Sequence, residues 1–361
     1  MGKPLKVGIV GCGAIIGQYL ATFRRLETLE LVAVADLDPV RAQTVADGYD
    51  GVRALSVDGL LAADDVELVL NLTIPTAHAE VALKAIAAGK GVYGEKPLAT
   101  TTAEAGQVLD AARAAGVVVG CAPDTVLGTG VQTALRAIRD GLIGAPISAT
   151  ATMVTPGHER WHPNPDFYYQ TGGGPLLDMG PYCISTLVNL LGPIVSVMGA
   201  ASNTRSTCTI AAGPRAGEVI PVSTAWHVTG ILVHATGAIS TLVTSFDAVE
   251  TKSANIEIHG ELGSLAVPDP NHFDGDVELF TLRADRWETL PVSAGYVNAV
   301  RGVGVMDLAG APAGSEPRAG GMLAYHVLEV MESVLQSART GAAVGIQSTS
   351  LRPRPVELQR N

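Results

Sequence analysis

The feature that most constrains this chain is a glycine turn between two apolar runs, within residues 6–36. Residues 7–10 form a short apolar run typical of a strand buried on both faces of a parallel sheet. Gly11 permits a tight turn, and Gly13 lets the backbone approach a pyrophosphate. A helix opening at Ala14 would direct its free N–H groups at that anion. Ile16 stands where the third glycine is usual, and we expect Gly17 to allow close helix–strand packing in its place.

Asp36 ends the second apolar run, Leu31 to Ala35. It lies about 20 residues past the turn, where an acceptor for an adenosine ribose 2′-hydroxyl is expected. A carboxylate repels a 2′-phosphate and no arginine follows directly, so the sequence favours NAD over NADP as the cofactor. The alternative is that Asp36 is simply a turn residue before Asp38 and Pro39.

Composition limits the class of partner. The chain has 361 residues, 47% of them hydrophobic and 16% charged, which predicts a globular protein long enough for two cores. The net charge of −11 argues against nucleic acid or an anionic membrane as a partner. Four scattered cysteines predict neither a zinc site nor disulfides and suit the cytoplasm. Because we find no long apolar run and the start passes straight into a strand, we expect neither a membrane span nor a signal peptide.

Strands and helices alternate through the first third of the chain. We expect helices at 39–46, 76–87 and 101–115 and strands at 68–71, 91–94 and 117–119, with Thr76 capping the second of these helices. This alternation predicts a doubly wound parallel sheet of the Rossmann type, in a domain that covers residues 1–122. Gly11, Thr73 and Lys96 each follow a strand, so they should converge at the carboxyl edge of the sheet.

The second part, residues 123–361, has a different pattern. One helix is expected at 130–140 and a late one at 323–338, with strands at 146–155, 194–201, 222–233, 238–246 and 253–267 and hairpin turns at 237–238 and 260–263. We interpret this part as an α+β domain with a large, mostly antiparallel open sheet. Residues 204–217 are expected to form an exposed loop. The tail from Ser348 is expected to be an extended arm on the surface or on a neighbouring subunit.

The first candidate for chemistry is Lys96, in the sequence Glu95-Lys96-Pro97. A lysine at the carboxyl end of a strand can hydrogen-bond a substrate oxygen and hold positive charge beside a nicotinamide. The alternative is an ordinary exposed lysine in a loop.

The second candidate is the segment 172–182, with three glycines, Asp178 and Tyr182. Asp178 is expected to cap a helix that has Pro181 in its first turn and ends at Gly192. Asp178 and Tyr182 then project to one side, and a nearby lysine would lower the pKa of the phenol from about 10, making a general acid or base. Alternatively, Asp178 is only a cap and Tyr182 a core aromatic.

The third candidate is the segment 157–169, which contains His158, Trp161, His162 and Tyr169. Aromatic rings that stack on sugar faces, and polar tips that bind hydroxyls, suit a polyol site. Two histidines four residues apart could suggest a metal, but the prolines argue against a helix and no third ligand is evident, so we expect none. A surface loop with an aromatic anchor is the other interpretation.

Together these motifs resemble the Gfo/Idh/MocA family, which includes glucose–fructose oxidoreductase and inositol dehydrogenase. The resemblance rests on GIVGCGAIIG, EKP and GGGPLLDMGPY, with the late helix AYHVLEVMES. It implies a Rossmann domain followed by a domain whose sheet commonly forms the interface of a homodimer or homotetramer. It also implies that Lys96 is the catalytic lysine and that Asp178 orients the reacting hydroxyl. Many members have a histidine where this chain has Tyr182, which leaves open whether Tyr182 or Lys96 is the main proton acceptor.

The expected reaction is the transfer of hydride between NAD and a secondary alcohol or ketone of a sugar, a sugar derivative or a cyclitol. Two alternatives remain: an NAD-dependent glycoside hydrolase that recycles its cofactor, and a non-catalytic dinucleotide-binding regulator. The expected catalytic residues are Lys96, Asp178 and Tyr182. The residues expected to contact the cofactor are Gly11, Gly13, Ala14, Ile15, Asp36, Thr73, Pro75, His78, Glu95 and Lys96. Those expected to contact the substrate are Lys96, His158, Trp161, His162, Tyr169, Asp178 and Tyr182.

Overall fold

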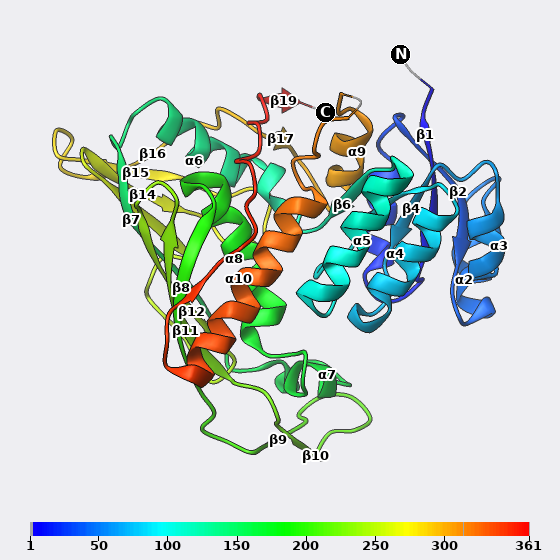
Figure 1. Cartoon of the computed structure of the whole chain (residues 1–361), viewed down its shortest axis with the longest axis horizontal. Coiled ribbons are helices and arrows are strands. Elements are labelled where there is room, and N and C mark those ends of the chain that lie inside the picture. Colours follow the sequence, from blue (N-terminus) through cyan, green and yellow to red (C-terminus); the bar gives the residue numbers. More distant parts are fainter. Residues whose placement is uncertain (1–2, 313, 361) are drawn as a thin grey trace. The chain divides into compact units, whose positions relative to one another are not determined.

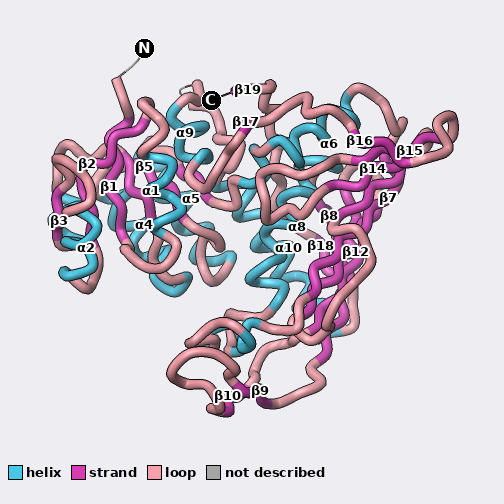
Figure 2. The backbone as a smooth tube through the Cα atoms, turned by 180° about the vertical axis from the view of Figure 1, so that it is seen from behind, coloured by secondary structure: helices cyan, strands magenta, loops and turns pink. Residues whose placement is uncertain are grey.

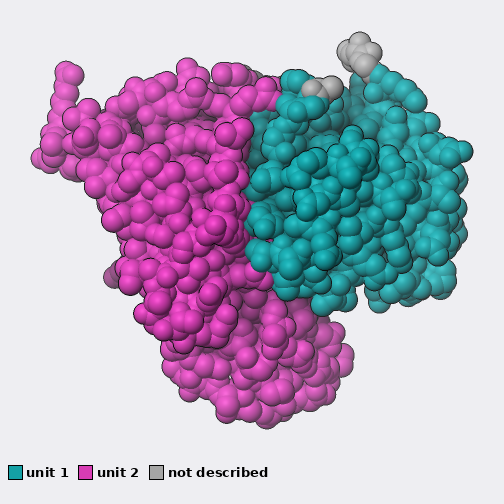
Figure 3. Space-filling model, in the orientation of Figure 1, with its two compact units in different colours: residues 1–127, 298–325 teal, residues 128–297, 326–361 magenta. Residues whose placement is uncertain are grey.

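The computed structural model describes residues 3–312 and 314–360 (Figure 1). The chain divides into two compact units, coloured separately in Figure 3. Unit 1 consists of residues 1–127 and 298–325, and unit 2 of residues 128–297 and 326–361. Compared with the predicted division after residue 122, unit 1 therefore also takes in a segment from late in the sequence.

Unit 1 is built on a parallel sheet with the strand order β3-β2-β1-β4-β5-β6. Figures 1 and 2 together show helices on both of its faces, which confirms the predicted Rossmann-type sheet. The strands are β1 (Leu5–Val10), β2 (Leu29–Ala35), β3 (Arg53–Leu55), β4 (Leu68–Asn71), β5 (Gly91–Gly94) and β6 (Val119–Cys121). The helices are α1 (Ile16–Phe23), α2 (Pro39–Ala46), α3 (Val57–Ala62), α4 (His78–Ala87), α5 (Thr102–Ala115) and α9 (Val303–Ala309), with short 3₁₀ turns at Pro75–Ala77 and Thr125–Leu127.

Several predicted boundaries in unit 1 are wrong. Helix α1 begins at Ile16, not Ala14, and a Cβ on Gly17 would meet open space, so this glycine is not needed for close packing. Thr76 does not cap α4, because it lies inside the 3₁₀ turn before that helix. Strand β6 starts at Val119, not residue 117, because the N–H of Val117 still bonds back to Ala112 at the end of α5. The elements β3 and α3 are short and were not expected.

Unit 2 contains a nine-stranded sheet in the described part of the chain, with the order β16-β15-β14-β13-β7-β12-β11-β8-β18. Only β12 and β7 pair in parallel among these strands, which confirms a mostly antiparallel sheet. The strands are β7 (Pro146–Val154), β8 (Ile194–Ser202), β11 (His227–His234), β12 (Ile239–Ser245), β13 (Ile256–Gly260), β14 (Gly263–Val267), β15 (Glu278–Thr281), β16 (Trp287–Thr289) and β18 (Val344–Gly345). The helices are α6 (Thr129–Arg139), α7 (Asp166–Tyr169), α8 (Pro175–Leu191) and α10 (Gly321–Thr340), of which α10 begins in unit 1.

Side chains alternate between the two faces of this sheet. In one row across the strands, Leu232 pairs with Val197 and Ser240, and all three are buried on the face covered by α8 and α10. In the adjacent row, Ile231 pairs with Met198 and both are exposed. The sheet therefore has one face packed against helices and one face that is open within the chain.

Three predictions about unit 2 need correction or completion. The expected loop at 204–217 contains a strand, β9 (Thr207–Thr209), which pairs with β10 (Val219–Pro221). The run 253–267 is a hairpin, β13 to β14, with its turn where the glycines predicted it. The tail lies on unit 2 itself: β19 (Gln359–Arg360) pairs with β17 (Tyr296–Val297), and Val356 is buried. Within the described residues, no helix has the length and apolar character needed to cross a membrane.

Asp124 anchors the late segment of unit 1. Its carboxylate is buried and accepts hydrogen bonds from the N–H groups of Gly302 (2.8 Å) and Gly304 (3.0 Å). Burial raises the pKa of Asp124 from 3.8 to about 6, although the hydrogen bonds and Arg301 oppose the shift. The folded protein thus binds this proton more tightly than the unfolded chain does.

This shift predicts a pH dependence of stability. Between about pH 4 and pH 6 the unfolded chain loses the Asp124 proton first, so this group lowers the free energy of unfolding as the pH rises. The variant Asp124→Asn has no such proton. We expect the free energy of unfolding of the wild type minus that of Asp124→Asn, from urea titrations, to fall across this range and then level off. A difference that stays constant or rises with pH would contradict the assignment.

Candidate active site

The glycine turn follows β1, in the middle of the parallel sheet. Gly11 has φ +103°, and a Cβ there would lie 2.6 Å from the carbonyl oxygen of Leu72, so only glycine fits. A Cβ on Gly13 would meet no protein atom, and the following Ala14 is exposed while Ile15 is partly buried. The turn is therefore tight on the sheet side and open on the other side, as the approach of a pyrophosphate requires.

Asp36 closes this turn from the end of β2. Its carboxylate accepts the N–H of Cys12 (2.7 Å) through one oxygen and the N–H of Asp38 (2.8 Å) through the other. Both interpretations of Asp36 thus have a structural basis, since it braces a turn and also presents a carboxylate at the expected position. A carboxylate has about four acceptor positions, so two such bonds leave capacity for ribose hydroxyls. The buried Cys12 thiol beside it has a pKa raised to about 11, first by burial and then by the charge of Asp36.

Apolar side chains are exposed around the same edge of the sheet. Leu37 directly follows Asp36 and is 96% exposed, and Ile74, after β4, is 69% exposed. Pro75 is also exposed, while the Thr73 hydroxyl donates to Asn71 (2.6 Å). Exposed apolar surface beside polar backbone groups suits the flat base of a nucleotide. The residues of this edge therefore fit the cofactor predicted for them.

Lys96 follows β5, so the three loops predicted to converge come from the neighbouring strands β1, β4 and β5. Glu95 is buried, and its carboxylate accepts the Tyr19 hydroxyl (2.7 Å) and the N–H of Lys96 (3.1 Å). The Tyr19 hydroxyl is held by this bond, and burial followed by the charge of Glu95 raises its pKa well above the usual value. Helix α1 therefore holds the backbone at Lys96 through the carboxylate of Glu95.

His78 holds the other side of the same loop. Its Nδ1 lies 2.6 Å from the carbonyl oxygen of Pro97, and its Nε2 lies 3.0 Å from that of Thr73. The ring is 2% exposed. A neutral imidazole can donate to only one of these carbonyls, and an imidazolium can donate to both. The structure therefore gives His78 and Glu95 a supporting place beneath the edge, where they join the loops after β4 and β5.

In unit 2, Asp178 and Tyr182 lie on α8, one helical turn apart, and so project to one side as predicted. The prediction that Asp178 caps this helix is wrong. The helix begins three residues earlier, at Pro175, with Gly174 as its cap, because Pro175 is favourable in the first turn. Asp178 is therefore in the first helical turn, and Tyr182 is buried.

His158 contacts Asp178 directly. Its Nε2 lies 3.2 Å from a carboxylate oxygen of Asp178, and the two side chains are 12% and 19% exposed. Nδ1 of His158 is buried and has no hydrogen-bond partner among the described residues. In the neutral ring this arrangement selects the tautomer that carries its proton on Nε2 and donates it to the carboxylate. The structure thus joins two predicted site residues, and it assigns the Nε2 of His158 to Asp178.

A buried pair beneath His158 holds it in place. The Tyr169 hydroxyl accepts the N–H of His158 (2.8 Å) and that of Glu159 (3.2 Å), and it donates to the carboxylate of Glu159. Tyr169 is fully buried against Trp226 and Phe246. Burial, followed by the bond to Glu159, raises the pKa of the Tyr169 hydroxyl. The structure therefore places Tyr169 in the core below the predicted substrate site, while Trp161 is exposed and His162 partly so.

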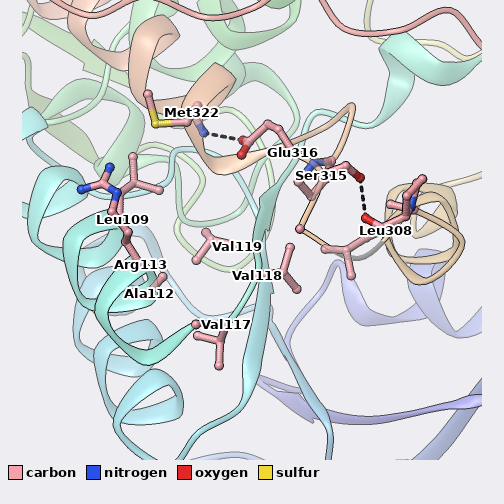
Figure 4. Close-up of a pocket in the computed structure, with 15 residues that line it drawn as sticks. Leu109, Ala112, Arg113, Val117, Val118, Val119, Leu308, Ser315, Glu316 and Met322 are labelled. Carbon is pink, nitrogen blue, oxygen red and sulfur yellow. Dashed lines mark hydrogen bonds between the residues drawn. The ribbon is translucent and has the colours of Figure 1, made fainter.

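Two further findings concern other kinds of site. Among the described residues, no group of three or more His, Cys, Asp or Glu side chains is placed to hold a metal ion. A cavity of about 550 Å³ in unit 1 lies between α5, the start of β6 and the segment after α9 (Figure 4). It is lined by Val117, Val118 and Val119, at the amino end of β6, and so faces away from the edge that carries the glycine turn. None of the predicted site residues lines it.

Sequence reasoning missed the residues that support the site. Nothing in the sequence distinguishes Tyr19 from other helix residues, Asn71 from other strand residues or Glu159 from other loop residues. Their hydrogen-bond partners can also lie far away in the sequence. Tyr19, for example, bonds to a residue 76 positions later. The one local signal is the Asn71-Leu72-Thr73 run after a strand, because asparagine commonly bonds the backbone two residues on.

A parallel sheet with a glycine turn, an acidic residue after its second strand and a lysine loop at the same edge defines a dinucleotide-binding protein. Comparison with known proteins agrees. The model of an oxidoreductase family with an NAD-binding Rossmann fold matches residues 5–122, and that of the GFO/IDH/MocA C-terminal domain matches residues 131–266. The chain belongs to the GFO/IDH/MocA family of NAD-binding oxidoreductases, which confirms the resemblance.

Named relatives act on sugars. The chain is 28% identical over 359 residues to D-glucoside 3-dehydrogenase of Escherichia coli (strain K12), which covers 95% of this chain and 97% of the relative. It is 32% identical over 208 residues to dTDP-3,4-didehydro-2,6-dideoxy-alpha-D-glucose 3-reductase of Saccharopolyspora spinosa, which covers 56% of this chain and only 61% of that relative. A crystal structure of an NAD binding oxidoreductase from Klebsiella pneumoniae has the same fold, with a TM-score of 0.84, 23% identity and coverage of 96% of this chain and 100% of that one.

The glycine turn gives a direct test of the geometry. We expect Gly11→Ala to lower the free energy of unfolding by about 2 kcal/mol or more, because of the positive φ and the contact with Leu72. The matched control is Gly17→Ala in α1, where a Cβ meets open space and alanine favours the helix, so stability should rise by up to about 0.5 kcal/mol. Urea unfolding measures both variants, and equal effects would show that the backbone at Gly11 is not constrained as described.

Proposed function

We propose that this protein is an NAD-dependent dehydrogenase or reductase that acts on a secondary alcohol or ketone of a sugar, a sugar derivative or a cyclitol. The observation that carries the proposal is the Lys96 loop, held from both sides at the same sheet edge as the glycine turn. A lysine on so rigid a support suits a reaction that depends on position. The sugar-linked names of the two relatives support the substrate class.

Each predicted catalytic residue has a proposed part in this reaction. When bound, the nicotinamide would accept a hydride from the carbinol carbon or return one to a carbonyl carbon. Lys96 contributes positive charge and a hydrogen bond to the reacting oxygen. The hydroxyl proton goes either to Tyr182 as the phenolate, with the Lys96 ammonium as donor to the reacting oxygen, or to Lys96 as the neutral amine. Asp178 orients the hydroxyl. His158 holds the carboxylate of Asp178 in place through its Nε2.

The two alternatives rank behind this proposal. A redox glycosidase would use the same residues and recycle its cofactor, but both relatives named above are redox enzymes by name. A regulator that only binds the dinucleotide would not need the carboxylate–histidine pair of Asp178 and His158. We therefore favour net oxidation or reduction of the substrate.

We propose NAD as the cofactor in preference to NADP, because Asp36 presents a negative charge at the end of β2. We also propose that the protein is a homodimer or homotetramer, in which the open face of the nine-stranded sheet forms an interface. Ile231 and Met198 on this face are 42% and 52% exposed in the single chain. Four buried, free cysteines suit a reducing compartment, and we propose the cytoplasm.

The experiment that tests the function is an incubation with NAD and a panel of sugars, cyclitols and glycosides. NADH absorbance and product masses are followed in the same samples. The proposal expects NADH to rise in step with a keto product. Cleavage of a glycoside without net NADH would replace it by the redox glycosidase, and binding of NAD with no turnover of any compound would favour the regulator.

Lys96→Ala tests the proposed catalytic lysine. We expect turnover to fall by roughly two to four orders of magnitude, the range for loss of proton-transfer catalysis, while the Kd for NAD changes by less than about threefold. Lys84→Ala is the matched control, because Lys84 lies on α4 and pairs with Glu80 on the surface. Near-normal turnover in Lys96→Ala would remove Lys96 from the mechanism.

Asp36→Asn tests the choice of cofactor. The amide oxygen can still accept the N–H of Cys12, but the charge is lost. We expect the ratio of kcat/KM for NADP to that for NAD to rise at least about tenfold, through loss of repulsion of the 2′-phosphate. Asp38→Asn, two residues further along, removes a nearby charge and should leave the ratio within about threefold. An unchanged ratio in Asp36→Asn, or a wild type that prefers NADP, would contradict the assignment.

A further inference from the structure

Three aromatic rings form a partly exposed surface on unit 2, which we call the aromatic shelf: Trp161, His162 and Phe167. Trp161 is 58% exposed and Phe167 is 54% exposed, although both are large apolar side chains. The His162 ring lies between them, with its centroid 5.3 Å from that of Trp161 and 5.5 Å from that of Phe167. The shelf thus presents two apolar surfaces with a polar ring between them.

The shelf begins next to the pair proposed to act on the substrate. The His158 ring has its centroid 5.2 Å from that of Trp161, and its Nε2 is 3.2 Å from Asp178. Trp161 therefore lies beside the His158–Asp178 pair, on the same unit. Because His158 stands between Trp161 and Asp178 in this chain of contacts, the shelf is placed to meet a group that the reacting sugar carries.

The shelf is mounted rigidly. The Tyr168 ring packs between Phe167 (4.0 Å) and His158 (4.3 Å), and Tyr169 behind it is fully buried. Asp166, at the start of α7, forms an ion pair with Arg215 (2.6 Å). Large aromatic side chains that stay exposed on such a fixed support typically mark a binding surface.

His162 adds a hydrogen-bond donor between the apolar rings. Its Nδ1 accepts the N–H of Asn164 (3.1 Å), so the neutral ring carries its proton on Nε2. Burial lowers the pKa of His162, which keeps the ring neutral at neutral pH. The shelf therefore offers an N–H group flanked by apolar faces. A sugar ring is complementary to this arrangement, because its two faces consist of C–H groups and its hydroxyls lie at the rim.

We propose that the aromatic shelf binds a second ring of the substrate, so that the preferred substrate is a glycoside whose aglycone is another sugar ring, not a free monosaccharide or cyclitol. This inference rests on the proposed function for the ring that reacts. The C–H face of the second ring packs on Trp161, with Phe167 extending the surface, and the Nε2–H of His162 donates to one of its hydroxyls.

The test compares disaccharides with the methyl glycosides of their reacting sugar, in the gluco, galacto and manno series and in both anomeric forms. We expect wild-type kcat/KM to be at least about tenfold higher for the best disaccharide than for its methyl glycoside, a ratio of the size expected for one stacking contact. In Trp161→Ala this ratio should fall to about one, because KM for the disaccharide rises. Trp287→Ala is the matched control, because Trp287 is a half-exposed tryptophan on β16 that packs at a tilt against Phe280.

Three results would overturn the inference. The first is that no disaccharide in the panel exceeds its methyl glycoside in kcat/KM. The second is that Trp161→Ala reduces kcat/KM for both substrates equally, which would make Trp161 part of the reacting-ring site or of the fold. A change in oligomeric state in Trp161→Ala, measured by light scattering, would assign the shelf to an interface between copies of the chain. If no sugar is turned over at all, the proposed function fails separately, and calorimetric titration of the NAD-loaded wild type and Trp161→Ala with the same disaccharides then decides whether the shelf binds a second ring.

Discussion

The hydrogen bonds that fix the loop at Lys96 are the constraint on which the first unit depends. Glu95 is buried between the Tyr19 hydroxyl and the N–H of Lys96, and the carbonyl of Pro97 faces the ring of His78. His78 also reaches the carbonyl of Thr73, so the loops after β4 and β5 are joined to each other and to α1. A lysine ammonium is strongly hydrated and its side chain is flexible. Fixing its backbone from two sides lowers the entropy that must be lost when it meets a substrate.

In the second unit, a different set of hydrogen bonds fixes the position of Asp178 and His158. Asp178 is on a helix that begins at Pro175, and its partner His158 is the first residue of a short 3₁₀ turn, His158–Arg160, that has no side-chain cap among the described residues. The Tyr169 hydroxyl supplies what is missing, because it binds two consecutive N–H groups and the carboxylate of Glu159 in the core. Buried hydrogen bonds of this kind give the short turn a defined conformation. The aromatic shelf is attached to this turn, so its rings are held in defined positions as well.

The motifs and the periodicity of the sequence were enough to predict the two types of sheet, the glycine turn and the convergence of Gly11, Thr73 and Lys96. These features depend on local rules: apolar runs, glycine spacing and the position of loops after parallel strands. What could not be predicted depends on contacts between distant residues. The burial of His78 and of Tyr169 is decided by packing partners that no local pattern reveals. For the same reason, the sequence indicated candidate site residues in each unit but not which residues support them.

The central claim is that hydride leaves a carbon of the sugar for the cofactor. The most direct measurement uses a substrate deuterated at the carbinol carbon, with the mass of the reduced cofactor and the rate of its formation recorded together. We expect the reduced cofactor to carry one deuterium, the product to be the corresponding keto sugar, and Lys96→Ala to slow this transfer. Deuterium that stays in the sugar or appears only in water, with no labelled cofactor, would contradict the account.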